Sequence, residues 1–86
     1  MGRAGEVIVD KLEARAPESS ICPSEVAREL WPGDEWRSRM PEVRRAAAQL
    51  AAEGTVRITQ KDTEVDASKI EEVRGPVRIR RGPRWR

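Results

Sequence analysis

The first third of the chain places its apolar residues at the spacing of an amphipathic helix. Within residues 5–16, Ile8 and Leu12 stand four positions apart, and charged residues occupy the opposite side of the helical projection. Pro17 ends this predicted helix, because the residue before a proline is disfavoured in the helical region. The apolar stripe comprises Val7, Ile8, Leu12 and Ala16.

A second, shorter helix is predicted over residues 23–30. Pro23 suits its first turn, where the backbone N–H that proline lacks would have no helical partner. The Trp-Pro-Gly turn at residues 31–33 stops the helix, and Ile21 and Cys22 before it fit a very short strand. The buried side of the helix comprises Val26, Ala27 and Leu30.

The longest predicted helix covers residues 41–53. Pro41 cannot donate the hydrogen bond that an earlier start would require, so the helix begins near this residue or continues, kinked, from a short turn capped by Asp34. Alanine, the best helix former, is dense in this segment, and Gly54 is the expected stop. The inward stripe comprises Val43, Ala47 and Leu50.

Strand patterns follow the last helix. In residues 55–60, Val56 and Ile58 alternate with polar residues, which is typical of a half-buried strand. The polar residues 61–63 predict a turn, and residues 64–65 are placed to pair back briefly with the strand before them.

The order helix, helix, strand, loop, strand predicts a winged helix-turn-helix. We therefore expect an α+β fold of three helices with a small antiparallel sheet of two or three strands, formed by residues 1–81. Residues 66–73 fit either one helical turn or a loop, and residues 77–80 provide the second strand. Residues 82–86 are expected to be a basic, mobile tail.

The size and composition of the chain argue against catalysis. Eighty-six residues make one domain that buries only about 60–65% of the surface of the unfolded chain. The chain has no histidine and a single cysteine, Cys22, so we expect no enzyme activity, no metal and no other cofactor. No apolar run approaches the length of a membrane span, and no signal peptide is recognisable, so we expect a cytoplasmic protein without a membrane or small-molecule partner.

Charge is unevenly distributed along the chain. Six arginines and no acidic residue fall between Arg74 and Arg86, which leaves 11 basic and 15 acidic residues in the rest. An acidic body with a basic end suggests an anionic partner for that end. A solvated tail without a partner would have the same composition.

Two runs of residues in the chain resemble those of a known family. The resemblance covers roughly residues 5–80 and includes the run Ile21-Cys22-Pro23-Ser24-Glu25-Val26-Ala27-Arg28 and the run Arg74-Gly75-Pro76-Val77-Arg78-Ile79-Arg80. Both runs resemble a small bacterial family known only as a domain of unknown function and thought to be winged-helix-like. The resemblance implies the same fold and brings no functional residues.

If the fold is a winged helix, residues 41–53 are expected to enter the major groove of double-stranded DNA. Arg45 and Gln49 face outward there, and arginine and glutamine pair with guanine and adenine edges. The protein would then be a DNA-binding module, such as a minor transcriptional regulator, that uses this helix. The candidate DNA-binding residues are Arg37, Arg39, Arg44, Arg45, Gln49, Lys61, Arg78, Arg80 and Arg81.

Other readings of the same residues stay open. The outer face of residues 41–53 fits an ordinary solvated helix, or a protein-interaction surface such as that of a homodimer. Trp31 and Trp36 fit core packing between helices, whereas Trp85 among arginines fits a binder of RNA or single strands.

Overall fold

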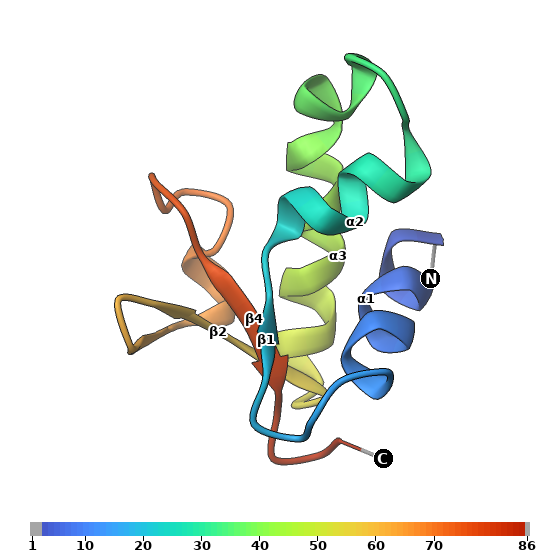
Figure 1. The fold of residues 1–86 in the computed structure, drawn as a ribbon. Coiled ribbons are helices and arrows are strands. Elements are labelled where there is room, and N and C mark those ends of the chain that lie inside the picture. Colours follow the sequence, from blue (N-terminus) through green and yellow to red (C-terminus); the bar gives the residue numbers. More distant parts are fainter. Residues whose placement is uncertain (1–2, 86) are drawn as a thin grey trace.

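The structure, a computed structural model, describes residues 3–85 and packs three helices against one antiparallel sheet (Figure 1). The α-helices are α1 (Arg3–Glu13), α2 (Pro23–Leu30) and α3 (Met40–Ala52). The strands are β1 (Ser20–Ile21), β2 (Val56–Gln60), β3 (Thr63–Val65) and β4 (Arg78–Arg81). Two short 3-10 helices, η1 (Glu35–Arg39) and η2 (Ala67–Lys69), complete the described elements.

The sheet has the strand order β1-β4-β2-β3, and each neighbouring pair is antiparallel. The sequence predicts two or three strands, whereas the described residues form four. The two short segments around Ile21 and Val65 both pair with a longer strand. Ile21 pairs with Ile79 of β4. Lys61 and Asp62, with φ of 51° and 67°, form a tight turn that returns β3 along β2.

Three helices and a four-stranded antiparallel sheet make an α+β fold. The order of the elements, with β4 between β1 and β2, is compatible with a winged helix-turn-helix. In that comparison α2 and α3 form the helix pair, and the chain between β2 and β4 takes the place of the wing.

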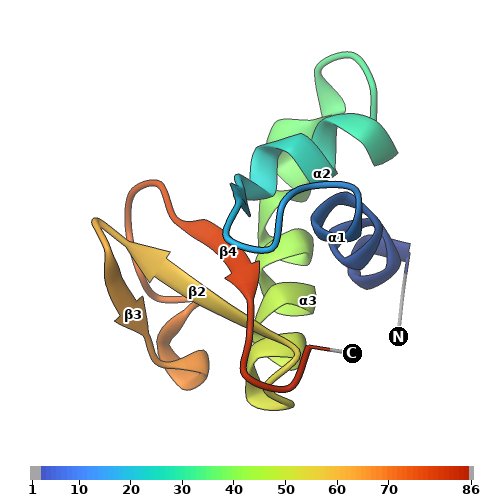
Figure 2. The same ribbon diagram turned by 60° about the horizontal axis from the view of Figure 1, so that its bottom comes forward.

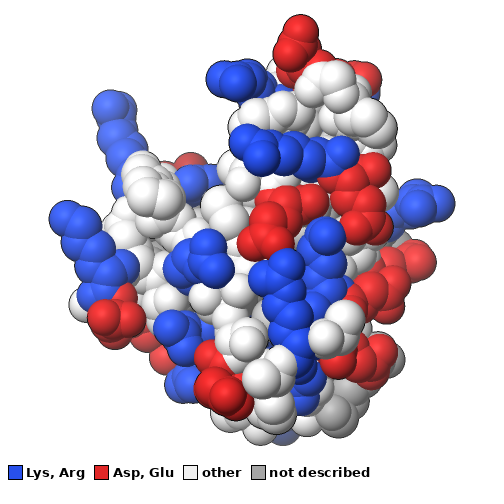
Figure 3. Space-filling view, in the orientation of Figure 1, with Lys and Arg blue, Asp and Glu red and all other residues white. Residues whose placement is uncertain are grey.

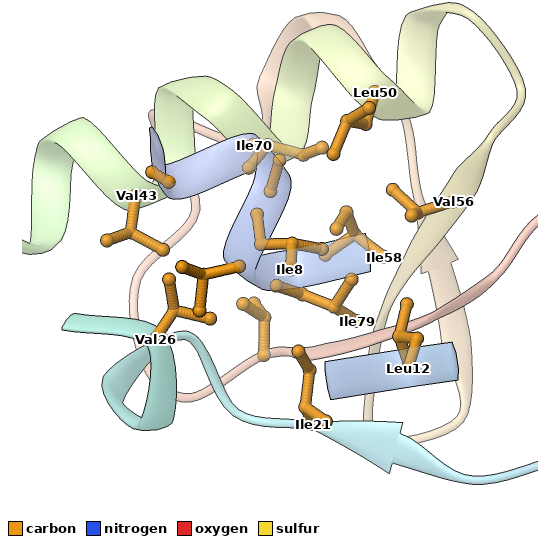
Figure 4. Close-up of a cluster of buried hydrophobic side chains, with 14 of the residues drawn as sticks. Ile8, Leu12, Ile21, Val26, Val43, Leu50, Val56, Ile58, Ile70 and Ile79 are labelled. Atoms are coloured by element: carbon orange, nitrogen blue, oxygen red, sulfur yellow. The ribbon is translucent and has the colours of Figure 1, made fainter. Parts of the chain in front are cut away.

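The core lies between α1, α3 and the inner face of the sheet (Figure 4). The predicted stripes are confirmed in α1 and α3, except that Ala16 is exposed because α1 already ends at Glu13. Ile58 and Ile79 face this core from neighbouring positions on β2 and β4. The fully buried side chains of the core include Ile8, Leu12, Ile21, Val26, Val43, Val56, Ile58, Ile70, Val77 and Ile79.

Helix α3 follows η1 without a break. It begins at Met40 and ends at Ala52, one residue earlier at each end than predicted. Gly54 has a φ of 84° and forms the expected left-handed stop. Asp34 precedes η1 as predicted, but its side chain makes no capping hydrogen bond.

The segment between β3 and β4, for which the sequence left helix and loop open, curls back beside α3 (Figure 2). Asp66 accepts hydrogen bonds from the hydroxyl and N–H of Ser68, which lower the pKa of Asp66 and shape η2. Ile70 then enters the core. This segment therefore forms part of the folded body.

The sequence predicts a mobile tail in residues 82–86, and in the structure residues 82–85 contact the rest of the fold. The N–H of Arg84 donates to the carbonyl of Gly54 at 2.8 Å, and the Trp85 ring is half-buried against the core. Arg86, the last residue of that predicted tail, lies outside the described residues.

Candidate nucleic-acid interface

The outward side of α3 carries charges of both signs. Arg45 and Gln49 are exposed, as predicted. Glu42 on α3 and Glu53, just after its end, are also exposed, and the Nε of Arg45 lies 3.6 Å from Oε1 of Glu71. Two exposed carboxylates, one of them paired with Arg39, and a paired guanidinium make this side a poor match to the phosphates that border a DNA groove.

The two arginines before α3 have different surroundings. Arg39 forms ion pairs with Glu35 at 2.8 Å and with Glu42 at 3.4 Å, and its guanidinium lies over the Trp31 ring. The hydrogen bond to Glu35 is the main cause of a raised pKa at Arg39. Arg37 is exposed, and its guanidinium carbon lies 4.9 Å from the centre of the Trp36 ring.

Arg44 holds the segment between β3 and β4 against α3. Its Nη1 donates to the carbonyl of Val73 and its Nη2 to the carbonyl of Gly75, both at 2.8 Å. The sequence suggested a DNA contact at this position, but both ends of the guanidinium are engaged with backbone.

Arg81 has a comparable structural role at the end of α1. Its Nη2 donates to the carbonyl of Leu12 in the last turn of α1 at 3.0 Å and to the carbonyl of Arg15, just after the helix, at 3.1 Å. The guanidinium carbon also lies 4.8 Å from the centre of the Trp85 ring. These contacts occupy much of the guanidinium that the sequence assigned to DNA.

Arg78 and Arg80 lie on the outer face of the sheet, opposite the face that packs on α3. Arg78 donates to the hydroxyl and carbonyl oxygens of Ser20 at 2.9 and 3.0 Å, and Arg80 donates to the carbonyl of Glu18 at 3.3 Å. All three acceptors are uncharged. Among residues 3–85, neither guanidinium has a carboxylate within 4.0 Å, although the charge of Arg78 helps to lower the pKa of Glu25 from a greater distance.

Arg57 joins them and was not among the predicted site residues. It stands directly opposite Arg80 across the β2–β4 pair, while Thr59 stands opposite Arg78. Like charges in directly opposed positions destabilise a sheet, and in the described part of the chain Arg57 has no acidic partner either. The alternation of residues 55–60 marked Arg57 as outward, but only the register shows that it faces Arg80.

We call Arg57, Arg78 and Arg80 the sheet arginines. Two of them, Arg57 and Arg80, line a shallow depression together with Thr59, Asp62 and Glu64. Its two carboxylates come from the β2–β3 turn and from β3, at the edge of the sheet. Figure 3, seen from the side on which β1 and β4 lie in front of α3, shows basic groups over this part of the surface with acidic groups among them. Lys61 is exposed in the same turn.

The structure therefore divides the predicted residues between two sides of the core. The residues of α3 lie on one side, and Arg78 and Arg80 lie beyond the sheet that α3 packs against. Buried side chains of both elements fill the space between them, so the two groups lie on different sides of the core.

Glu25, at the start of α2, accepts hydrogen bonds from residues on either side of β1. Burial disfavours its charged form, but hydrogen bonds from the Cys22 N–H and the Arg15 guanidinium outweigh burial and hold the pKa of Glu25 below its usual value. Cys22 is half-buried, and its sulfur accepts a hydrogen bond from the Ser24 hydroxyl at 3.1 Å. This arrangement fits a structural role for Cys22.

Comparison with known proteins identifies a family without revealing a function. A family model described as "Protein of unknown function (DUF3253)" matches residues 3–82, almost the whole chain, which confirms the resemblance to a family of unknown function. No curated protein shows a significant match. Within residues 3–85, none of the helices has the length and apolar character needed to cross a bilayer.

Proposed function

The chain belongs to the DUF3253 family of proteins of unknown function, and we propose that it is a DNA-binding module that holds the phosphate backbone of a duplex with its sheet arginines. The observation that carries this proposal is the opposition of Arg57 and Arg80 on neighbouring strands, with no carboxylate within 4.0 Å of either among residues 3–85. A bound phosphate would remove the repulsion between them.

The geometry of a strand suits such contacts. Arg78 and Arg80 are two residues apart on β4, so they stand about 7 Å apart along one face. Arginine binds phosphate oxygens through paired N–H groups, and phosphate contacts supply most of the affinity of non-specific DNA binding. Hydrogen bonds from Arg78 to Ser20 already orient its side chain along the sheet.

This proposal moves the interface away from the helix that the sequence favoured. Base reading by Arg45 and Gln49 would have to occur beside Glu42 and Glu53, so we assign α3 no primary contact. Binding through phosphates alone selects no base sequence. A regulatory role in transcription would therefore need a further specific contact, and the chain is proposed to act by binding in the cytoplasm without a catalytic step.

A salt titration with a random DNA duplex tests the proposal. The logarithm of the binding constant, measured by fluorescence anisotropy, should fall linearly with the logarithm of the salt concentration. The expected slope is about −2.7 for three phosphate contacts. The R57Q/R80Q variant should bind more weakly and reduce the magnitude of the slope by about 1.8. The matched R37Q/R45Q variant removes the same charge near α3 and should keep the slope of the parent protein.

Two results would overturn this assignment. Absence of binding at about 50 mM salt, where electrostatic contacts are strong, would reject DNA binding altogether. A loss of slope in R37Q/R45Q but not in R57Q/R80Q would return the interface to the neighbourhood of α3.

A further inference from the structure

A second surface forms where the end of α2, η1 and the start of α3 meet. The guanidinium carbons of Arg28 and Arg37 lie 4.5 and 4.9 Å from the centre of the Trp36 ring. Arg28 is eight positions before Trp36 in the sequence, so only the fold brings them together. We call Arg28, Trp36 and Arg37 the tryptophan clamp.

The arginines of the clamp carry charge that the chain leaves unpaired. In the part of the chain that the structure describes, neither Arg28 nor Arg37 has a carboxylate within 4.0 Å. Arg39, close by in η1, differs because it contacts both Glu35 and Glu42. The clamp therefore offers two guanidinium groups without a carboxylate partner among the described residues.

Apolar surface lies beside the clamp. Leu30, Trp31 and Met40 are only half-buried, although they touch the core. A hollow in the neighbouring surface is lined by Arg3, Ala4, Glu29, Leu30, Trp31 and Glu42. In Figure 3 this upper end of the molecule shows uncharged surface bordered by charged groups.

We propose that this surface binds a segment of another protein in which acidic side chains accompany an apolar one. A guanidinium stacked on an aromatic ring keeps its in-plane N–H groups free for paired hydrogen bonds to a carboxylate, and stacking has already restricted its motion. The adjacent hollow would take the apolar side chain. Tryptophan and arginine are also the residues that most often dominate binding energy at protein interfaces.

The surroundings favour a protein segment over a nucleic acid. Guanidinium groups lie over the Trp36 ring, where a stacked base would have to be placed. Glu29 and Glu42 at the hollow would repel a phosphate chain that continued across it. A short acidic segment that ends at the clamp and places its apolar side chain in the hollow brings no negative charge beside these two acids.

Selection from a random peptide library against the full-length chain tests this inference. Peptides that combine Asp or Glu with a large apolar residue should be enriched. A representative enriched peptide should bind at least tenfold more weakly to R28A/R37A, and the change should exceed that for R28K/R37K, which keeps the charge but not the planar group. Circular dichroism should show that both variants remain folded, since the two side chains are exposed.

The outcomes separate this site from the DNA site. The R57Q/R80Q variant should bind the peptide like the parent protein, and an excess of DNA duplex should not displace it. The inference is overturned if no peptide is enriched, if enriched peptides lack acidic residues, or if R28A/R37A binds them unchanged. Preferential displacement by a single-stranded oligonucleotide would instead identify a nucleic-acid site.

Discussion

Replacing Arg44 with alanine should loosen the segment between β3 and β4. The change removes two hydrogen bonds of 2.8 Å, to the carbonyls of Val73 and Gly75. A hydrogen bond from a charged donor contributes about 1.5–3 kcal/mol when shielded from water. Gly75 is exposed and Val73 is half-buried, so we take about 1 kcal/mol for each bond and expect a total loss of about 2 kcal/mol.

The loss should extend beyond the segment itself. Ile70 lies in the same segment and is 1% exposed, so movement of the segment disturbs the core. For a domain of this size, about 2 kcal/mol corresponds to a fall in melting temperature of about 8–16 °C. Alanine is a good helix former, so the substitution should not weaken α3 itself.

The neighbouring residue provides a matched control. Arg45 pairs with Glu71 at 3.6 Å, and the two side chains are 61% and 56% exposed, so their ion pair contributes little. R45A should change the free energy of unfolding by no more than about 0.5 kcal/mol. Urea denaturation measures both variants, and hydrogen exchange of residues 67–75 detects any local opening. If R44A matched R45A in both measurements, the structural role of Arg44 would be refuted.

Three further predictions concern the pH dependence and packing of the fold. Glu25 has a lowered pKa because hydrogen bonds, including that from the Cys22 N–H, outweigh the opposing effect of burial. Its stabilisation is therefore present above the unfolded pKa of about 4.3 and disappears as the pH falls through the lower folded value. E25Q should accordingly be less stable than the parent at pH 7 and converge with it in acid, as urea titrations at several pH values would show; a constant difference would contradict this. An added Cβ at Gly82 would lie 2.4 Å from the Gly54 carbonyl oxygen, so thermal melting should show G82A to be more destabilised than G33A, whose added Cβ meets open space despite a φ of 86°. I70A should lose about 2–5 kcal/mol in chemical denaturation, and a loss below about 1 kcal/mol would place Ile70 outside the core.

Local sequence patterns determined the elements that depend on nearby residues. The spacing of Val43, Ala47 and Leu50 indicated which side of α3 is buried, and Gly54 marked where the helix ends. Such signals are readable because side-chain direction repeats every 3.6 residues in a helix and every two in a strand. The same reasoning marked Arg57 as outward on β2.

The candidate sites depended on contacts that local patterns do not contain. Arg44 and Arg45 look equivalent as neighbours in the sequence, yet only Arg44 reaches carbonyls 29 and 31 positions away. Ile70 came from a segment with no clear period and still entered the core. These outcomes follow from how distant segments pack, and no helical or strand repeat encodes them.

The composition by itself established a small chain without histidine and with a basic end, while the fold decided which of its arginines remain available. Register between β2 and β4 placed Arg57 opposite Arg80, and packing of η1 against α2 brought Arg28 to Trp36. The physical reason is that the charge of a guanidinium belongs to its residue, whereas the availability of that charge depends on the partners that tertiary packing brings within reach.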